Sequence, residues 1–424
     1  MLPCLPPWRQ RKAGRLRTIA PMPSSPFLRM ALILGLLSAI GPFAIDMYLP
    51  ALPDIGASLH AEVGPVQWSL TAFFLALGVG QVVYGPVSDM LGRKPPLYFG
   101  LALFVLTSIA CALTSDIRML VLLRFLQGLG AAAGTVIPRA VVRDLHTGHE
   151  AARLMSLLML VFSVSPLLAP LIGSGVIALT GWRGVFWVVA LLGVAGALMV
   201  RRTLPETLAP ENRHAGTLAN AARAYGVLLR DVHYLGLVGI GSFTMAGFFV
   251  FLAGSPFVFI NHYGLTPVQY SLAFSINAAA FFVSAQFTAR LGRRFGLEPV
   301  TVWAASGAGV MMVLLLAYYL LGGDGMWVLL TCYFIASGCM GLVIPTTSVL
   351  ALDDHGPIAG TASALMGTLQ MLIGTVAMAV AGLFATGDPL PMVIGMATGA
   401  LIGVLLTWIT FRHRPQALAK AGPA

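Results

Sequence analysis

Long apolar runs separated by short polar connections recur along nearly the whole chain, and they constrain its fold more than any other feature. They lie at about 28–50, 67–88, 97–114, 119–142, 152–178, 183–203, 233–260, 267–289, 299–321, 326–350, 357–384 and 390–411. A helix needs about 20 apolar residues to cross a bilayer. Only 9% of the residues are charged, against about a quarter in soluble proteins. We therefore predict an all-α integral membrane protein with twelve transmembrane helices.

A polar segment at 204–232 divides the runs into six and six. It is predicted to be a cytoplasmic linker with room for an amphipathic helix on the membrane surface. The predicted domains are a basic tail at 1–27, six-helix halves at 28–203 and 233–412, this linker, and a tail at 413–424. Two patterns return about 200 residues later: Leu91-Gly92-Arg93-Lys94 as Leu291-Gly292-Arg293-Arg294, and Gly134 to Pro138 as Gly341 to Pro345. Internal repeats of this kind are typical of transporters.

The net charge of +10 is distributed as a topology signal. Of the 25 Lys and Arg residues, 22 fall on the side of the N-terminus, Arg118 and Arg183 fall on the other side, and Arg124 falls within a span. The positive-inside rule then predicts both termini in the cytoplasm. Because the charge is spread over the connections, we expect no nucleic acid partner. The basic, proline-rich residues 1–26 are predicted to be a cytoplasmic tail, not a signal peptide, with a later translation start at Met22 or Met30 as the alternative.

Several classes of site find no support in the sequence. The cysteines, Cys4, Cys111, Cys332 and Cys339, are scattered, which favours neither a disulfide framework nor a metal site. No phosphate-binding loop is present, so direct coupling to ATP is not expected. We predict no cofactor, no metal and no enzymatic activity, because no paired catalytic carboxylates or histidine cluster is present, and a proton gradient is the expected energy source.

The stretch 85–97, Gly-Pro-Val-Ser-Asp-Met-Leu-Gly-Arg-Lys-Pro-Pro-Leu, places charges and helix breakers between two apolar runs. Its residues Gly85, Asp89, Gly92, Arg93 and Lys94 resemble the cytoplasmic signature loop of the major facilitator superfamily. The pattern departs at Met90, where a basic residue is more usual. The resemblance implies two six-helix halves related by a pseudo-twofold axis. It also implies a gate, in which Asp89 meets the N-terminal dipole of the span beginning at Gly356-Pro357 when the cytoplasmic side closes.

Asp46 stands near the far end of the first predicted span. If Arg29 marks the inner interface, a rise of 1.5 Å per residue puts Asp46 about 25 Å farther along. An ionised Asp at the centre of a helix costs about 3 kcal/mol, so Asp46 is expected to face a cavity or carry a proton. The alternative is an interfacial cap on a helix that ends at Pro50. The sequence Leu49-Pro50-Ala51-Leu52-Pro53 with the preceding Asp resembles the first span of drug:proton antiporters in this superfamily.

Arg124 lies within the fourth predicted span and needs a counter-charge or carbonyl partners there. The segment Leu123-Arg124-Phe125-Leu126-Gln127-Gly128-Leu129-Gly130 resembles the family's span-4 motif, whose Arg is associated with proton transfer. The alternative is an Arg that extends to the outer interface near Arg118. If Arg124 and Asp46 share a cavity, burial favours the neutral acid and the guanidinium favours the anion, so a conformational change would load or release the proton.

The fifth predicted span carries Pro166, Pro170 and Gly173, and its prolines predict a bend because they remove helix hydrogen bonds. The pattern resembles the motif associated with antiporters, with Ala169 and Ser174 in place of its usual glycines. The alternative is an ordinary kinked packing helix.

The resemblance implies a central cavity lined by the first, fourth, seventh and tenth spans. Candidate lining residues are apolar or neutral polar side chains within spans: Phe73, Gln127, Met245, Phe248, Asn277 and Gln370. The alternative for each is an ordinary core or lipid-facing position.

Three further patterns extend the resemblance to residues 28–412: Gly181-Trp182-Arg183, Leu204-Pro205-Glu206-Thr207-Leu208, and Gly360-Thr361-Ala362-Ser363-Ala364 with Gln370. The whole chain resembles the bicyclomycin and chloramphenicol resistance exporters (Bcr/CflA) among the twelve-span drug:proton antiporters. This implies a monomeric multidrug efflux transporter of the bacterial inner membrane. It would export small amphipathic, drug-like compounds in exchange for protons by alternating access. A proton symporter that imports a small nutrient is the closest alternative, and a non-transporting receptor or enzyme is another.

Overall fold

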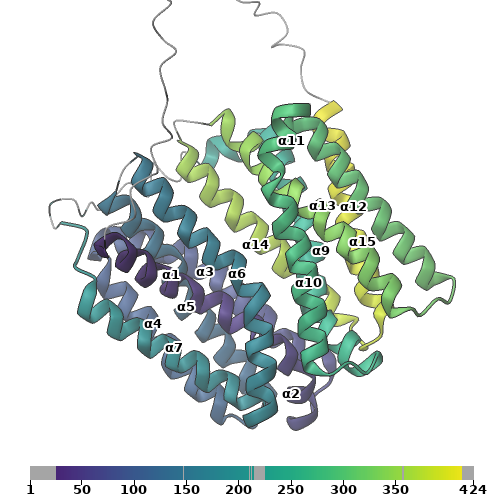
Figure 1. The fold of residues 1–424 in the computed structure, drawn as a ribbon, viewed down its shortest axis with the longest axis horizontal. Coiled ribbons are helices and arrows are strands. Elements are labelled where there is room, and N and C mark those ends of the chain that lie inside the picture. The colour runs from purple at the N-terminus through teal and green to yellow at the C-terminus, as the bar shows by residue number, and fades with distance from the viewer. Residues whose placement is uncertain are drawn as a thin grey trace, which may run out of the picture.

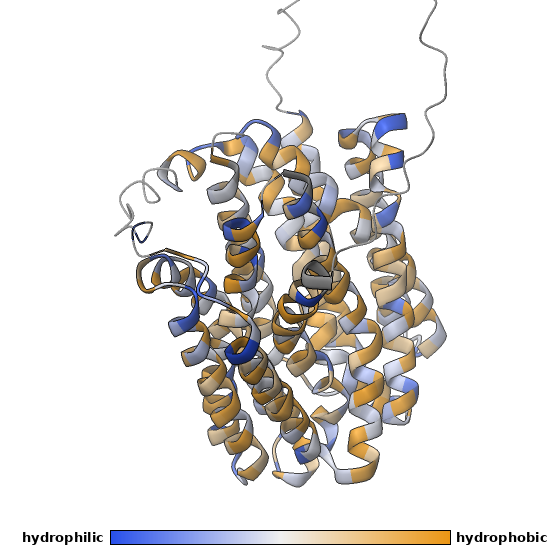
Figure 2. Ribbon diagram, turned by 60° about the vertical axis from the view of Figure 1, so that its left-hand side comes forward, coloured by the Kyte–Doolittle hydropathy of each residue, from blue (hydrophilic) through white to orange (hydrophobic). Residues whose placement is uncertain are grey.

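The computed structural model describes residues 25–146, 148–209, 211, 213, 225–355 and 358–412, and these form helices without strands. Among them, twelve helical segments are long and apolar enough to cross a membrane, which confirms the predicted fold class. Figure 2 shows apolar residues along most of the length of these helices. Residues 1–24 of the predicted tail at 1–27, the predicted tail at 413–424, and residues 210, 212 and 214–224 of the predicted linker at 204–232, in which an amphipathic helix was expected, lie outside the described residues.

The N-terminal half contains six spans. The first consists of α1 (Ser25–Asp46), the short 3-10 turn η2 (Leu49–Ala51) and α2 (Leu52–Ser58). The other five are α3 (Val63–Leu91), α4 (Lys94–Leu113), α5 (Ile117–Leu145), α6 (Gly148–Thr180) and α7 (Trp182–Thr203).

The C-terminal half repeats this order. Its first span is α9 (Val232–Pro256) with η4 (Phe257–His262), followed by α10 (Pro267–Gln286) and the short surface helix α11 (Thr288–Phe295). The remaining spans are α12 (Leu297–Leu320), α13 (Met326–Asp353), α14 (Ala359–Leu383) and α15 (Pro389–Arg412). Figure 1 shows the two halves side by side.

Glycines on α5 bring its neighbours close. A Cβ atom at Gly128 would lie 2.3 Å from the carbonyl oxygen of Phe73 on α3, and one at Gly134 would lie 2.7 Å from that of Leu37 on α1. Such distances leave no room for a side chain, so α5 packs backbone to backbone against both helices. This packing leaves Arg124, one turn before Gly128, inside the half.

The halves meet through α6 with α10 and through α3 with α14. The hydroxyl of Ser271 donates to the carbonyl of Pro170 at 2.9 Å, and that of Ser275 donates to the carbonyl of Leu167 at 2.9 Å. Near the same end of the molecule, Gly64 of α3 lies against the carbonyl of Gly382 on α14. The halves are thus joined at the end that carries α2 and η4, opposite the 85–97 corner.

The internal repeat has a different register from the one that the sequence suggests. Gly92, between α3 and α4, has φ 91° and ψ 170°, a conformation that is open almost only to glycine. The matching corner of the second half is formed by Gly296, with φ 88° and ψ 152°, between α11 and α12. Gly292, which the sequence pattern equates with Gly92, lies inside α11. The basic residues of the second copy extend a helix, so its corner comes four residues later.

Candidate functional site

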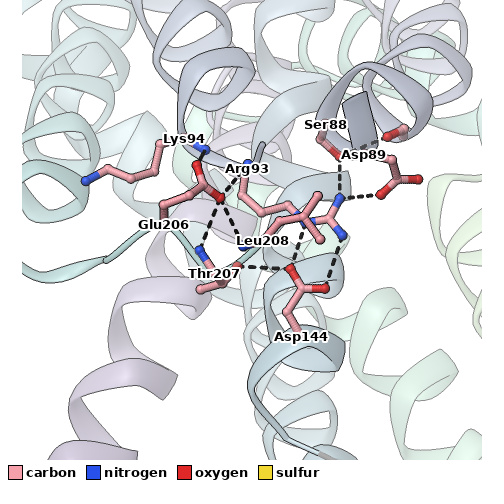
Figure 3. A network of polar contacts seen from close by, with 9 residues as sticks. Ser88, Asp89, Arg93, Lys94, Asp144, Glu206, Thr207 and Leu208 are labelled. Carbon is pink, nitrogen blue, oxygen red and sulfur yellow. Dashed lines mark hydrogen bonds and ion pairs between the residues drawn. The ribbon is translucent and has the colours of Figure 1, made fainter. Parts of the chain in front are cut away.

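The 85–97 corner is organised around the guanidinium of Arg93, which is only 5% exposed (Figure 3). This group donates to Asp89 at 2.5 Å, to the hydroxyl of Ser88 at 2.8 Å, and to both carboxylate oxygens of Asp144 on α5 at 2.7 and 3.1 Å. Burial alone lowers the pKa of Arg93, but the hydrogen bonds to Asp144 and Asp89 outweigh it and raise the pKa above its usual value. The charged guanidinium of Arg93 thus connects the ends of α3 and α5 to the start of α4 through these hydrogen bonds.

Glu206, just after α7, completes the corner from the opposite side. Its carboxylate accepts the backbone N–H groups of Arg93 at 2.8 Å and Lys94 at 3.0 Å, and also those of Thr207 and Leu208 (Figure 3). Burial alone raises the pKa of Glu206, but these backbone hydrogen bonds outweigh it and the pKa lies below its usual value. Glu206 therefore caps the free N–H groups at the start of α4.

Sequence reasoning gave no role to Asp144 or Glu206. In the sequence, Glu206 belongs only to the family-like pattern from Leu204 to Leu208. Its place just after the last basic residues of a span was the one feature that could have predicted a role in the corner. Asp144 offered only its place at the end of a span. Asp89 contacts Arg93 with a side chain that is 60% exposed. Gly356 and Pro357, its predicted partners in the closed state, lie outside the described residues, and a Cβ at Gly85 would meet open space.

Asp46 is the last residue of α1 and is only 6% exposed. Its oxygen Oδ2 accepts a hydrogen bond at 3.1 Å from the hydroxyl of Ser165 on α6. The helical segment does not end at Pro50, because η2 and α2 continue it to Ser58. Asp46 thus lies inside the bundle, between α1 and α6.

Arg124 is completely buried within the N-terminal half. Its guanidinium carbon lies 4.3 Å from the ring centres of both Tyr48 and Phe73, within the range of cation–π attraction. It donates to the carbonyl of Ala44 at 3.3 Å and to the amide oxygen of Gln127 at 2.6 Å. Within the described part of the chain it forms no ion pair with Asp46, and two of its nitrogens have no partner. Its link to the end of α1 runs through the Ala44 carbonyl, and it does not extend to the interface.

The bend motif of α6 packs against the segment that carries Asp46. Pro166 and Pro170 lie inside the helix, and a Cβ at Gly173 would lie 2.5 Å from the carbonyl oxygen of Met47. The same part of α6 supplies the two carbonyls that bind the serines of α10. The motif therefore contacts both α1 and the other half, which is more than an isolated kink requires.

A cavity of about 250 Å³ lies between the halves, directly beside this part of α6. It is lined by aromatic, apolar and neutral polar side chains of α6, α9, α10 and α13: Phe162, Pro166, Met245, Phe248, Phe251, Phe274, Asn277, Ala278, Phe281, Phe282, Tyr333, Ser337 and Met340. Three of the six candidate residues, Met245, Phe248 and Asn277, are among them.

The other candidates lie elsewhere. Phe73 and Gln127 are fully buried beside Arg124, and Gln370 on α14 lies against Gly241 of α9. Of the four spans expected to line the cavity, the seventh and tenth do so, whereas the fifth and eighth replace the first and fourth. The reason is that Tyr48, Phe73 and Arg124 fill the centre of the N-terminal half.

One polar atom on the cavity wall has no hydrogen-bond partner among the described residues. The amide nitrogen of Asn277 donates to the carbonyl of Ala273 at 2.8 Å, but its oxygen Oδ1 accepts no hydrogen bond. A buried polar atom without a partner costs about 1–3 kcal/mol. Among the described residues, no group of three or more His, Cys, Asp or Glu side chains is arranged to hold a metal ion.

Comparison with known proteins identifies the family. The sequence profile of the Major Facilitator Superfamily matches residues 34–379. The chain belongs to this superfamily. It is 36% identical over 380 residues to the uncharacterized MFS-type transporter YdgK of Bacillus subtilis (strain 168), covering 89% of this chain and 94% of the relative.

A second relative indicates which group within the superfamily the chain resembles. The bicyclomycin resistance protein homolog of Haemophilus influenzae is 31% identical over 386 residues, covering 88% of this chain and 94% of the relative. This similarity confirms the predicted resemblance to the bicyclomycin and chloramphenicol resistance group. Among solved structures, a D-xylose-proton symporter aligns with a TM-score of 0.74 at 15% identity, over 93% of this chain and 100% of the symporter, which shows the shared fold. The chain is a multi-pass membrane transporter.

Proposed function

We propose that this superfamily member exports small, uncharged aromatic compounds in exchange for protons. The observation that carries the proposal is the cavity between the halves, which has an almost wholly apolar wall and includes Pro166, the residue after Ser165, the hydrogen-bond partner of Asp46. No acidic or basic side chain lines it, so it offers no ion-pair partner to a charged drug. The name of the Haemophilus relative, a bicyclomycin resistance protein homolog, supports export of antibiotics.

The cavity wall also indicates the chemistry of the cargo. A volume of about 250 Å³ lies just below the range of about 300–1,000 Å³ that is usual for small-molecule sites. Seven aromatic side chains provide ring faces and edges. A hydroxyl or amide N–H on the compound would supply the missing partner of Asn277, and Tyr333 offers a second hydrogen bond.

We propose that Asp46 carries the proton. Ser165, which donates to its carboxylate, directly precedes Pro166, a residue of the cavity wall. A compound bound against Pro166 would hold Ser165 on the carboxylate, and that hydrogen bond favours the anion and so the loss of the proton. Release of the compound would loosen the bond and favour protonation, so that compound and proton bind in turn, as exchange requires. Arg124 holds the end of α1 through the carbonyl of Ala44, and thereby positions Asp46.

Proton flux across everted vesicles or proteoliposomes tests whether Asp46 carries the proton. Adding chloramphenicol or bicyclomycin to everted vesicles should dissipate a preformed proton gradient. Asp46→Asn should abolish uphill export while binding of uncharged compounds persists. Asp54→Asn, which removes an exposed carboxylate on α2 in the same span, is the control and should transport normally. Normal proton-coupled export by Asp46→Asn would refute the role of Asp46. Solute and proton movement in the same direction would instead indicate a nutrient symporter, and no flux with any solute would indicate a receptor or enzyme.

We further propose that the protein acts as a monomer in the bacterial inner membrane with both termini in the cytoplasm. The distribution of 22 basic residues against 2 supports this orientation. Leu321, 88% exposed between α12 and α13, would then face outward, and Phe295, 43% exposed at the end of α11, would face inward. In a cysteine-free background, a thiol reagent that cannot cross the membrane should label Leu321→Cys but not Phe295→Cys. The reverse pattern would invert the orientation.

A further inference from the structure

A second apolar hollow lies on the outer surface of the N-terminal half, away from the cavity between the halves. It is a groove of about 450 Å³ between α1, α6 and α7. Its lining is wholly apolar: Ala31, Leu32, Gly35, Leu36, Ala39, Ile40, Phe43, Leu157, Leu160, Val161, Val164 and Leu192. Because the groove runs along spanning helices, the membrane, not water, fills it.

The length of the groove matches one leaflet of a bilayer. Its lining on α1 runs from Ala31 to Phe43, about 18 Å at 1.5 Å per residue. Half of the hydrocarbon core measures about 15 Å. Small side chains on α1 form the floor, and a Cβ at Gly35 would lie 3.2 Å from Val161 on α6. These dimensions fit a single acyl chain.

Three arginines lie beyond one end of the groove, one on each of the three helices that line it. Arg29 precedes the lining residues Leu32 and Leu36 of α1 by three and seven positions, so it lies on the same helix face. Arg153 precedes Leu157 and Leu160 of α6 by four and seven positions. Arg202 ends α7 at the same end of the bundle. All three are exposed, and in the described part of the chain no carboxylate forms an ion pair with Arg29 or Arg202.

The C-terminal half offers a comparison within the same molecule. Its first, fifth and sixth spans, α9, α14 and α15, enclose a groove of about 840 Å³. Among the described residues, no Lys or Arg lies within one turn of that lining. In the described part of the chain, that groove has no counterpart of Arg29 or Arg153, although Arg412 ends α15 as Arg202 ends α7.

We propose that the groove between α1, α6 and α7 binds one anionic phospholipid. An acyl chain lies along α1, and the phosphodiester lies at Arg29, Arg153 and Arg202. The length of the apolar groove then matches the acyl chain, and the positive charge of the arginines matches the phosphodiester of the same lipid. Since α1 carries Asp46 and α6 carries Ser165, the bound lipid braces the two helices whose contact the proton-coupling site needs.

Native mass spectrometry of the purified full-length protein, titrated with dioleoyl phosphatidylglycerol or dioleoyl phosphatidylcholine, tests the proposal. Arg29→Gln with Arg153→Gln should weaken phosphatidylglycerol binding about 30-fold, at about tenfold per 1.4 kcal/mol and about 1 kcal/mol per arginine. The matched control, Arg290→Gln with Arg293→Gln on α11, removes two exposed charges from the same end of the molecule and should change binding less than about threefold. Equal effects of both pairs, or equal binding of the two lipids by the unaltered protein, would overturn the proposal.

A second pair of variants tests the acyl chain independently of charge. Leu160→Trp adds bulk over the groove at a position that is 57% exposed, and should weaken dioleoyl phosphatidylglycerol binding while leaving the short-chain dihexanoyl lipid unaffected. Leu168→Trp, on the same helix, 48% exposed and outside the lining, should change neither. If inorganic phosphate competes fully, or if both variants bind alike, the site holds a phosphate and not a lipid, and the proposal is wrong.

Discussion

Replacing Glu206 with Ala should loosen the start of α4. The carboxylate accepts the N–H groups of Arg93 and Lys94, which have no partner within the helix because they stand at its N-terminus. Among the described contacts, the amides of Arg93 and Lys94 have Glu206 as their only acceptor. The next two residues, Pro95 and Pro96, carry no N–H. Without the carboxylate, the two amides must bind water.

The size of the effect follows from the capping geometry. A capping side chain contributes about 1 kcal/mol, and a carboxylate at a helix N-terminus adds about 0.3–1 kcal/mol where solvent screens it. Glu206 is exposed, so we take a total of about 1.5 kcal/mol, which corresponds to roughly tenfold in the local opening equilibrium. Glu206→Gln keeps one acceptor oxygen, and should therefore lose less.

Hydrogen exchange measured by mass spectrometry on a peptide covering residues 92–97 reports these amides directly. Exchange should be about tenfold faster in Glu206→Ala, intermediate in Glu206→Gln, and unchanged in a peptide from α12 that serves as the internal control. Because folding lowers the pKa of Glu206, its stabilisation is complete above the usual pKa of 4.5 and is lost as the pH falls through the lower pKa of the folded state. Wild-type exchange rates in Glu206→Ala at neutral pH would show that the carboxylate does not cap α4.

Three further substitutions test the corner and the bend. Asp89→Asn should slow transport while drug affinity in a binding assay stays within about threefold, if Asp89 is a gate contact; complete loss of binding would contradict that role. Gly92→Ala should cost about 1–3 kcal/mol in thermal unfolding, since its φ of 91° disfavours any side chain, and unchanged stability would show that the corner relaxes. Gly173→Ala should lower both stability and transport because its Cβ meets the Met47 carbonyl at 2.5 Å, whereas Gly175→Ala, with no atom within 4 Å, is the control and should do neither.

Features that depend on neighbouring residues could be predicted from the sequence, whereas contacts between distant residues could not. Spanning helices could be predicted because each satisfies its own backbone hydrogen bonds, so apolar length alone identifies it. Gly92 was informative for the same reason, since a tight corner excludes a side chain locally. The prolines of α6 likewise predicted a bend, although the sequence did not show which helices this bend contacts.

Only the tertiary structure decided which side chains meet. Arg93 is 113 residues from Glu206, and Asp46 is 119 residues from Ser165, so no local pattern could pair them. The sequence identified Arg124 as a buried cation but not its aromatic surroundings, which occupy the space that the first and fourth spans were expected to give to the cavity. The sequence by itself determined the twelve apolar helices, because each depends on the transfer of its own segment into lipid. It also determined that most Lys and Arg residues lie in the connections on one side of the membrane. The packing of those helices decided where the cavity, the corner and the lipid-facing groove lie, because each is built from residues that only the folded bundle brings together.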